Sequence, residues 1–438
     1  MRRRAMDHQR WFRSLSLASG VLAVLLWLPT AVAAQEMDEF FDDGVVHEIR
    51  LTINSKDWSA LKTNFKENIY YPCSLQWRGL TVRNVGIRSR GLGSRSGTKP
   101  GLRVDIDRYA ADQTFVGLKS FVLDNLVQDP SMLRERVAMA FFRRMGFPAP
   151  RETHARLFIN NQFVGMYAVV ETIDKGFLAR NLGQDSEGKV ENDGYLFEYK
   201  YTDDYRFEYR GSDLEEYKFF EPKTNENKAA AQIWGPIEDM IQAMNQSPDG
   251  TFVRDMSEYL DLGLFAKHIA TEAFLAEDDG ILGYAGLNNF YFYRFEHGNR
   301  SQFLPWDKDN TFHSIDFPIM KGVNENVLAR RTLNERDYRD RYLETLLNAA
   351  ESADEPETEV DEDGNEKPKN KDGENSGPGW LEREITRQYE QIRTFARADT
   401  FKPHSNDEFE DAYQLLLEFA RNRSSFVRDE VAALRNRR

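Results

Sequence analysis

The hydrophobic pattern changes its period part-way along the chain, and this change limits the folds that the chain can adopt. Between residues 45 and about 170, apolar side chains fall mostly in short alternating runs, as in strands with one buried face. From residue 229 onward, they mostly recur at the three- and four-residue spacing of helices that bury one face. We therefore predict an α+β protein whose sheet-rich first half packs against a helix-rich second half, with a binding cleft between them.

Local signals place the individual elements. One predicted helix interrupts the strands of the first half, because Asp129 is a suitable N-cap, Pro130 suits the first helical position and Gly146 supplies a stop. The predicted strands are residues 46–53, 75–77, 80–88, 102–106, 121–124, 155–159, 163–171, 195–201 and 217–221. The later predicted helices are residues 229–244, 262–275, 380–396 and 409–434, and a hairpin pairs residues 289–295 with residues 301–306.

The N-terminal segment has the parts of an export signal. Several arginines precede an apolar stretch at residues 15–28, and Ala31, Val32 and Ala33 have the small-residue spacing that signal peptidase requires. We expect residues 1–33 to be removed as a signal peptide. The mature protein is then exported to the periplasm, the cell surface or the medium, without stable membrane insertion. An uncleaved anchor is the alternative, since residues 15–34 are just long enough to cross a thin bilayer.

Charge and residue types exclude several classes of protein. Residues 1–33 hold five arginines and one aspartate, so their removal leaves 53 basic and 71 acidic residues, a net charge of −18 that disfavours nucleic acid as a partner. The single cysteine, Cys73, cannot form an internal disulfide or, by itself, a thiolate zinc site. No HExxH or G-x-S-x-G sequence occurs, which disfavours zinc proteases and serine hydrolases.

Much of the acidic excess is local. Residues 351–374 contain eleven acidic residues and almost no large apolar side chain. Such a composition buries too little surface to offset the entropy of ordering, so we predict a disordered insert at residues 350–378. The insert is either a spacer or a docking arm for a basic partner.

A basic, glycine-containing loop stands out in this acidic chain. Six cations lie within 21 residues: Arg83, Arg88, Arg90, Arg95, Lys99 and Arg103. They surround Gly91, Gly93 and Gly97, in the order strand, loop, strand. Glycines let backbone N–H groups approach a ligand, and fixed cations suit phosphate. The pattern predicts an anion site, with a solvated basic hairpin as the alternative.

Two acidic segments flank the predicted hairpin. If its turn is centred between Gly298 and Asn299, facing residue numbers sum to about 597, and Asn289 lies opposite Lys308 with Asp307 as its neighbour. Facing positions are about 5 Å apart. An amide and a carboxylate oxygen at that distance suit Mg²⁺ or Mn²⁺. Asp278 and Asp279, after the preceding helix, are candidate bases; solvent-exposed loop carboxylates are the alternative.

Glu171 ends a strand and alternates with core residues, so its carboxylate needs a cationic partner, for which Lys99 is the natural candidate. A Lys–Glu pair, a base and two metal ligands form the protein-kinase arrangement. Ion pairing without catalysis is the alternative.

In their shared order, these features resemble the CotH family of secreted, kinase-like proteins, over residues 40–345 and more weakly over 380–438. The matching residues are Val46, His47, Asp57, Trp58, Arg88, Arg90, Gly91, Lys99, Pro100, Arg134, Gly165, Tyr167, Glu171, Asp174, Lys223, Thr224, Asn225, Asp279, Gly280, Asn288, Asn289, Phe290, Tyr291, Pro305, Trp306 and Asp307. The resemblance implies a bilobal, atypical protein-kinase-like fold. The N-lobe is then residues 40–200 and the C-lobe residues 201–349, with the helices of residues 379–438 packing on the C-lobe.

The resemblance also implies roles for residues. Asp279 is the implied base, with Asp278 as the alternative, and Asp307 and Asn289 are the implied metal ligands, with Asn288 as the alternative to Asn289. Lys99, paired with Glu171, is the implied phosphate contact. The implied ATP-binding residues are Arg88, Arg90, Gly91, Lys99 and Arg103, of which Arg103 shares or replaces the role of Lys99.

The implied reaction is Mg²⁺- or Mn²⁺-dependent transfer of the ATP γ-phosphoryl group to Ser or Thr of an exported protein. A surface scaffold or adhesin that has lost the reaction is the rival hypothesis. A metal-dependent phosphohydrolase is the third.

Overall fold

The computed structural model describes residues 35–184, 188–360, 366–368 and 377–436; the predicted signal peptide lies outside them. The first half is a closed barrel with strand order β1-β2-β3-β4-β5-β7-β6, in which β1 and β6 pair in parallel. The strands are β1 (His47–Ile53), β2 (Tyr71–Trp77), β3 (Leu80–Ser89), β4 (Leu102–Asp105), β5 (Ser120–Asp124), β6 (Glu152–Ile159) and β7 (Gln162–Glu171).

Alternating side chains fill the barrel. In β1, Ile49, Leu51 and Ile53 are buried while the residues between them are at least partly exposed, which is the two-residue period expected of a strand with one buried face. Phe40, from the short helical segment before β1, is fully buried among Trp77 and other aromatic rings. A short helix, α3 (Ser55–Thr63), is capped by Asn54, whose side chain accepts from Lys56 N at 2.9 Å.

The helix predicted from Asp129 begins later than expected. Helix α4 spans Arg134–Arg144, and the Asp129 carboxylate accepts from the backbone N–H groups of Leu133 and Arg134 at 2.8 and 2.9 Å. Asp129 therefore caps the helix from an extra turn that precedes it. The stop is as predicted, because Gly146 has a φ of +85°, which ends helical geometry at little cost for glycine.

The second half combines a four-stranded sheet, in the order β11-β10-β8-β9, with several helices, and confirms the predicted α+β class. The strands are β8 (Tyr195–Tyr199), β9 (Phe220–Pro222), β10 (Phe290–Arg294) and β11 (Ser301–Pro305). The helices are α5 (Lys175–Asn181), α6 (Ala230–Ile233), α7 (Gly235–Gln246), α8 (Phe252–Met256), α9 (Leu262–Phe274), α10 (Val327–Asn334), α11 (Arg336–Asp354), α12 (Trp380–Ala398) and α13 (Asn406–Asn436), with 3₁₀ turns at Leu214–Tyr217 and Asp249–Thr251. No helix in the described ranges is long and apolar enough to cross a membrane.

Two predicted boundaries in this half are wrong. The single helix predicted at 229–244 is divided into α6 and α7, because Pro236 in the first turn of α7 starts a new helix after Trp234. The insert predicted to begin at residue 350 begins later, since α11 continues to Asp354 with Ala350 and Ala353 buried. Short strands β12 (Thr358–Val360) and β13 (Glu366–Pro368) pair beyond it, and residues 361–365 and 369–376 lie outside the described part.

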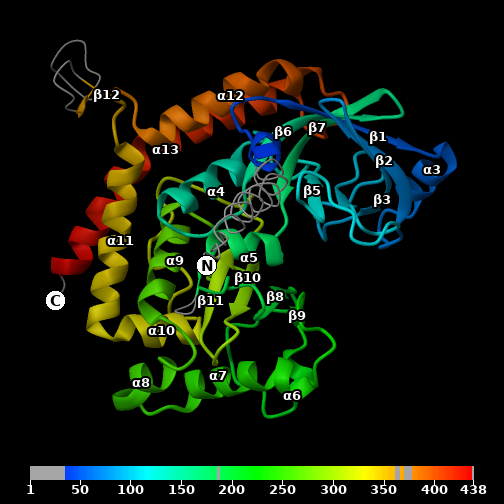
Figure 1. Ribbon diagram of the computed structural model, residues 1–438. Helices are drawn as coiled ribbons and strands as arrows, with labels where there is room; N and C mark the ends of the chain where they lie inside the picture. Colours follow the sequence, from blue (N-terminus) through cyan, green and yellow to red (C-terminus); the bar gives the residue numbers. More distant parts are fainter. Residues whose placement is uncertain (1–34, 185–187, 361–365, 369–376, 437–438) are drawn as a thin grey trace, which may run out of the picture.

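Helix α12 contacts both halves of the molecule. It runs from α11 and α13 to the barrel (Figure 1) and contacts both α4 and the barrel strand β7. Trp380 at its start lies 5.9 Å from Phe141 of α4, between ring centroids. The C-terminal helices were predicted to pack on the helix-rich half. They do so, but α12 also packs against the barrel.

Candidate active site

A cavity of about 700 Å³ lies where the barrel meets the second sheet. Seven of the predicted site residues line it: Arg88, Arg90, Gly91, Arg103, Asp279, Asn289 and Asp307. Lys99 and Glu171 do not. The lining comes from the β3–β4 loop, from β8 and β9, and from the segments on either side of the β10–β11 hairpin. Basic and acidic residues that are far apart in the sequence thus face one space.

The hairpin brings Asn289 and Asp307 together, but in a register that differs from the prediction. Phe290 pairs with Pro305, so facing residue numbers sum to 595 instead of 597, and Asn289 is level with Trp306 instead of Lys308. The cause is the turn, which Phe295 N closes on Arg300 O at 2.9 Å, so that its centre lies one residue earlier than expected. The shift leaves Asn289 and Asp307 at the hairpin's open end.

Both of these residues have a left-handed backbone, with φ of +58° for Asn289 and +54° for Asp307. Asn and Asp adopt this conformation more readily than other residues with side chains. Asn289 directly precedes β10 and Asp307 lies two residues after the end of β11, so each left-handed residue turns the chain at one end of the hairpin. Asn and Asp at these two positions therefore serve the backbone as well as the site.

Asp279 is the aspartate of the Asp278–Asp279 pair that faces the cavity. Its Oδ2 accepts from Asn288 Nδ2 at 3.1 Å and from Asn289 Nδ2 at 3.2 Å. Burial raises the pKa of Asp279, and the Asn288 hydrogen bond opposes that rise. Asp278 instead forms an ion pair with Lys321, outside the cavity lining. Geometry thus favours Asp279 as a base, while Asn288 and Asn289 both remain within reach of a ligand.

Arg90 and Asp307 form the charged centre of the cavity. Arg90 lies 3.6 Å from Asp124, between Nη1 and Oδ2, and its guanidinium carbon is 5.6 Å from the centre of the Trp306 ring. Burial lowers the pKa of Arg90, but the charges of Asp307 and Asp124 outweigh it and the pKa is raised. Burial raises the pKa of Asp307 to about 6, although Arg90 opposes the shift. The Arg90 guanidinium is thus a fixed positive charge close to the Asp307 carboxylate.

The glycine loop is held by its own residues. Arg95 donates from Nε to Gly91 O at 2.7 Å and from Nη2 to Asn68 Oδ1 at 2.6 Å. Asn125 Nδ2 donates to Ser94 O at 2.9 Å and to Lys99 O at 2.8 Å. Arg95 therefore shapes the loop and also lines the cavity. Arg90 is the cation that lies against the Trp306 ring.

The predicted Lys99–Glu171 pair is wrong. Lys99 Nζ donates to Asp399 Oδ2 at 2.8 Å, and both side chains are buried. Glu171 accepts from Arg151, at 2.8 Å from Nη2, and from Arg180. Lys99 lies in the loop between β3 and β4, whereas Glu171 is the last residue of β7, and the two side chains pair with different partners. These two residues support the fold and do not face the proposed ligand.

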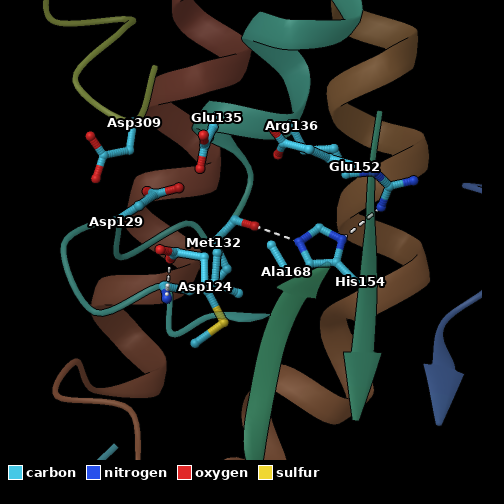
Figure 2. A pocket seen from close by; sticks show the side chains of 10 residues that line it. Asp124, Asp129, Met132, Glu135, Arg136, Glu152, His154, Ala168 and Asp309 are labelled. Carbon is cyan, nitrogen blue, oxygen red and sulfur yellow. Dashed lines mark hydrogen bonds between the residues drawn. The ribbon is translucent and has the colours of Figure 1, made fainter. Parts of the chain in front are cut away.

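An acidic chamber next to the cavity was not predicted. It is a space of about 10 Å³ lined by Asp124, Asp129, Glu135, Glu152 and Asp309, which arrive from separate segments (Figure 2). Neither oxygen of Glu152 accepts a hydrogen bond from a described residue, and burial raises the pKa of Glu152 to about 8. Beside the carboxylates, His154 is held between Arg136 Nη1 at 2.6 Å and Met132 O at 2.7 Å (Figure 2). Three of the five carboxylates lie within residues 124–135, but they come from a strand end, a loop and a helix, so no recognisable motif signals the chamber.

A second unpredicted feature is a network of four charged side chains at the ends of β8 and β9. Glu198 pairs with Lys200 at 2.6 Å and with Lys223 at 2.7 Å, and Glu221 pairs with both lysines. Although burial opposes it, Lys223 and Lys200 lower the pKa of Glu198 to about 2. All four residues line the cavity, as the arginines do.

The described residues contain no group of three or more His, Cys, Asp or Glu side chains that are placed to hold a metal ion. An ion at Asp307 must therefore take other ligands. The carboxylate of Asp307 and the amide oxygen of Asn289 are hard oxygen donors on one cavity, and water and phosphate oxygens complete such a shell. This donor set fits Mg²⁺ or Mn²⁺.

Comparison with known proteins gives one family match and several similar proteins. A family model described as CotH kinase protein matches residues 87–357. Inner spore coat protein H of Bacillus subtilis is 23% identical over 399 residues, which are 88% of this chain and 97% of that protein. Invasin CotH2 of Rhizopus delemar is 26% identical over 223 residues, 50% of this chain and 35% of that protein. The crystal structure of the Helicobacter pylori proinflammatory kinase CtkA covers 74% of this chain and 94% of that chain, at 11% identity and a TM-score of 0.28.

Proposed function

The chain belongs to the CotH kinase family, and from this premise we propose that it transfers the γ-phosphoryl group of ATP to Ser or Thr of an exported protein. The observation that carries the proposal is the common cavity of Asp279, Asn289, Asp307 and the arginines of the β3–β4 region. A base, two oxygen donors for a divalent ion and cations for phosphate are the parts that phosphoryl transfer requires.

Each residue has a distinct task in the proposed reaction. Asp279 orients the acceptor hydroxyl and accepts its proton as the bond to phosphorus forms. Asp307 and Asn289 hold Mg²⁺ or Mn²⁺, which when bound neutralises charge on the transferred phosphoryl group. Arg90 and Arg103 bind phosphate oxygens from the barrel side, and the new phosphoester leaves with the protein while ADP is released.

The proposed location follows from the export signal and from the names of relatives. A spore coat protein and a fungal invasin are proteins of cell or spore surfaces by their printed names. We place this protein, after removal of residues 1–33, in the periplasm, at the cell surface or outside the cell. We propose ATP and an exported protein as its partners; the acidic net charge disfavours nucleic acid, and we expect no stable membrane insertion once the signal peptide is removed.

The test uses the purified mature protein, labelled ATP, and Mn²⁺ or Mg²⁺. We expect label to enter the protein or a Ser-rich acceptor, and Asp307→Ala and Asp279→Asn to reduce transfer by about 10²- to 10⁴-fold. Asp278→Asn is the matched control, since Asp278 pairs with Lys321 outside the cavity. Transfer that is absent from the wild type, or undiminished in both cavity variants, contradicts the proposal.

A surface scaffold or adhesin without activity is the second candidate, favoured by the name of the invasin relative. Calorimetric titration with ATP and Mn²⁺ separates the two, because a scaffold gives no metal-dependent heat of binding. Phosphate release without protein labelling identifies a phosphohydrolase instead.

A further inference from the structure

We propose that Lys308 and Glu272 are positioning residues for this site. Their buried ion pair holds in place the three segments that carry Asp279, Asn289 and Asp307. The inference rests on the proposed function and extends it to two residues that do not line the cavity.

The contacts of the pair reach all three segments. Lys308 Nζ donates to Glu272 Oε1 at 2.7 Å and to the backbone oxygen of Asn289 at 2.9 Å. The other Glu272 oxygen accepts from Ile281 N at 3.0 Å, two residues after Asp279. Lys308 itself directly follows Asp307. One pair therefore ties helix α9 to the base and to both oxygen donors.

The close approach of Glu272 also explains a glycine. A Cβ added at Gly280 would lie 2.7 Å from a Glu272 carboxylate oxygen and 2.8 Å from its carboxyl carbon. No side chain fits in that space without moving Glu272. Gly280 is thus required next to Asp279 because the Glu272 carboxylate packs directly against the backbone there.

The pair is isolated from solvent and from substrate. The Lys308 side chain is 0% exposed and the Glu272 side chain is 3% exposed, and neither lines the cavity. Despite burial, Lys308 lowers the pKa of Glu272 to about 2, so both groups carry charge at neutral pH. Two charges held in the interior are costly unless they are paired and hydrogen-bonded, and this pair meets both conditions. Its effect on the reaction must act through the segments that it holds.

The experiment measures kcat, the KM for ATP and the Mn²⁺ concentration that gives half-maximal activity, well below each variant's melting temperature. We expect Lys308→Met and Glu272→Gln to lower kcat about 10- to 100-fold and to raise the Mn²⁺ requirement, with the KM for ATP changed less than about 3-fold. Glu272→Gln keeps the shape and an acceptor for Ile281 N, so it serves where Lys308→Met fails to fold.

Two further variants separate positioning from general stability. The double variant Lys308→Met/Glu272→Gln removes the unpaired charge and should recover melting temperature but not kcat, because the bond to Asn289 O is still lost. Asp399→Asn breaks the other buried lysine pair and should lower the melting temperature without changing the Mn²⁺ requirement. A kcat within 3-fold of the wild type in folded Lys308→Met and in Glu272→Gln overturns the inference.

Failure of the proposed function has a different outcome. If the wild type binds Mn²⁺ and ATP without transferring label, calorimetry on the same variants decides: Mn²⁺ affinity weakened at least about 10-fold supports positioning of the ligands, and unchanged affinity overturns it. Absence of Mn²⁺ and ATP binding in the wild type overturns both proposals.

Discussion

Two buried lysine–carboxylate pairs among the described residues have nearly the same geometry, but the pKa values of their lysines shift in opposite directions. Lys99 lies 2.8 Å from Asp399 and Lys308 lies 2.7 Å from Glu272, each measured from Nζ to oxygen, and both lysines are buried. Burial outweighs Asp399 and lowers the pKa of Lys99. Burial also acts on Lys308, but Glu272 and other carboxylates nearby outweigh it and raise its pKa.

The surroundings explain this difference. Lys99 Nζ lies 5.3 Å from the centre of the Tyr167 ring, and Asp399 also accepts from Met166 N at 2.9 Å. That pair joins the segment after α12 to the barrel wall. Lys308 lies among carboxylates beside the cavity, where a fixed cation offsets their repulsion. The distance within an ion pair therefore does not show whether the pair only supports the fold or also serves a site. The charges that surround each pair distinguish the two cases.

The largest expected effect on stability comes from breaking the Lys99–Asp399 pair. Asp399→Ala leaves Lys99 buried without its partner and removes the acceptor of Met166 N, so we expect the free energy of unfolding to fall by about 3–5 kcal/mol. Chemical denaturation at neutral pH measures it. The double variant Lys99→Met/Asp399→Leu should recover most of the loss, because no buried charge remains. A loss below about 1 kcal/mol in Asp399→Ala would mean that the pair is not a tie.

The next effect tests which cation meets phosphate. Arg90→Gln should raise the KM for ATP about 10- to 100-fold, because a hydrogen bond between charged groups contributes about 1.5–3 kcal/mol. Lys99→Met should lower the melting temperature and leave the KM for ATP nearly unchanged, because Lys99 does not line the cavity. Initial-rate kinetics with varied ATP measures both. A KM raised equally by the two variants would support the phosphate-binding role of Lys99 that the family resemblance implied.

Two buried glutamates extend the comparison to pH. Lys308 lowers the pKa of Glu272 to about 2, whereas burial without such a lysine raises the pKa of Glu152 to about 8. Between an unfolded pKa of about 4.3 and this value, the folded state holds a proton that the unfolded state has released, so stability falls as pH rises.

Glu152→Gln removes this dependence. In metal-free protein, we expect its melting temperature to exceed that of the wild type by a few degrees at pH 9 and by less at pH 5. Glu272→Gln has no such benefit at pH 9, because it leaves Lys308 without a charged partner. A difference between Glu152→Gln and the wild type that stays constant from pH 5 to 9 would contradict the raised pKa of Glu152.

The sequence was informative where the chemistry is local. Asn289 and Asp307 could be brought together from the ends of one hairpin, and Arg90 and Gly91 from one loop between strands. The predicted register was two positions out, because the length of a turn is not fixed by which turn residues it contains. The open end of the hairpin tolerates that error, since both residues flank it in either register.

Pairing across long separations could not be predicted in the same way. Lys99 finds its partner 300 positions later, in a segment that follows the acidic insert and lies beyond the matched residues 87–357. Lys99 was the predicted partner because the Glu171 carboxylate needs a cation, but Arg151 and Arg180 supply that charge instead. The acidic chamber was missed for another reason: the fold turns carboxylates of different elements toward one buried space, and their spacing in the sequence matches no known motif.

The smallest expected effect concerns the exposed side of α12. Arg387 bonds to Asp43 Oδ2 at 3.0 Å and to Glu384, and about two fifths of its side chain is exposed to water. Arg387→Ala should lower the free energy of unfolding by about 0.2–1 kcal/mol, and less at 1 M salt, where such pairs are screened. Denaturation at low and high salt measures the difference. A decrease in the free energy of unfolding as large as that of Asp399→Ala would mean that exposed contacts hold α12 to the barrel. Burial would then not determine how much an ion pair contributes to stability.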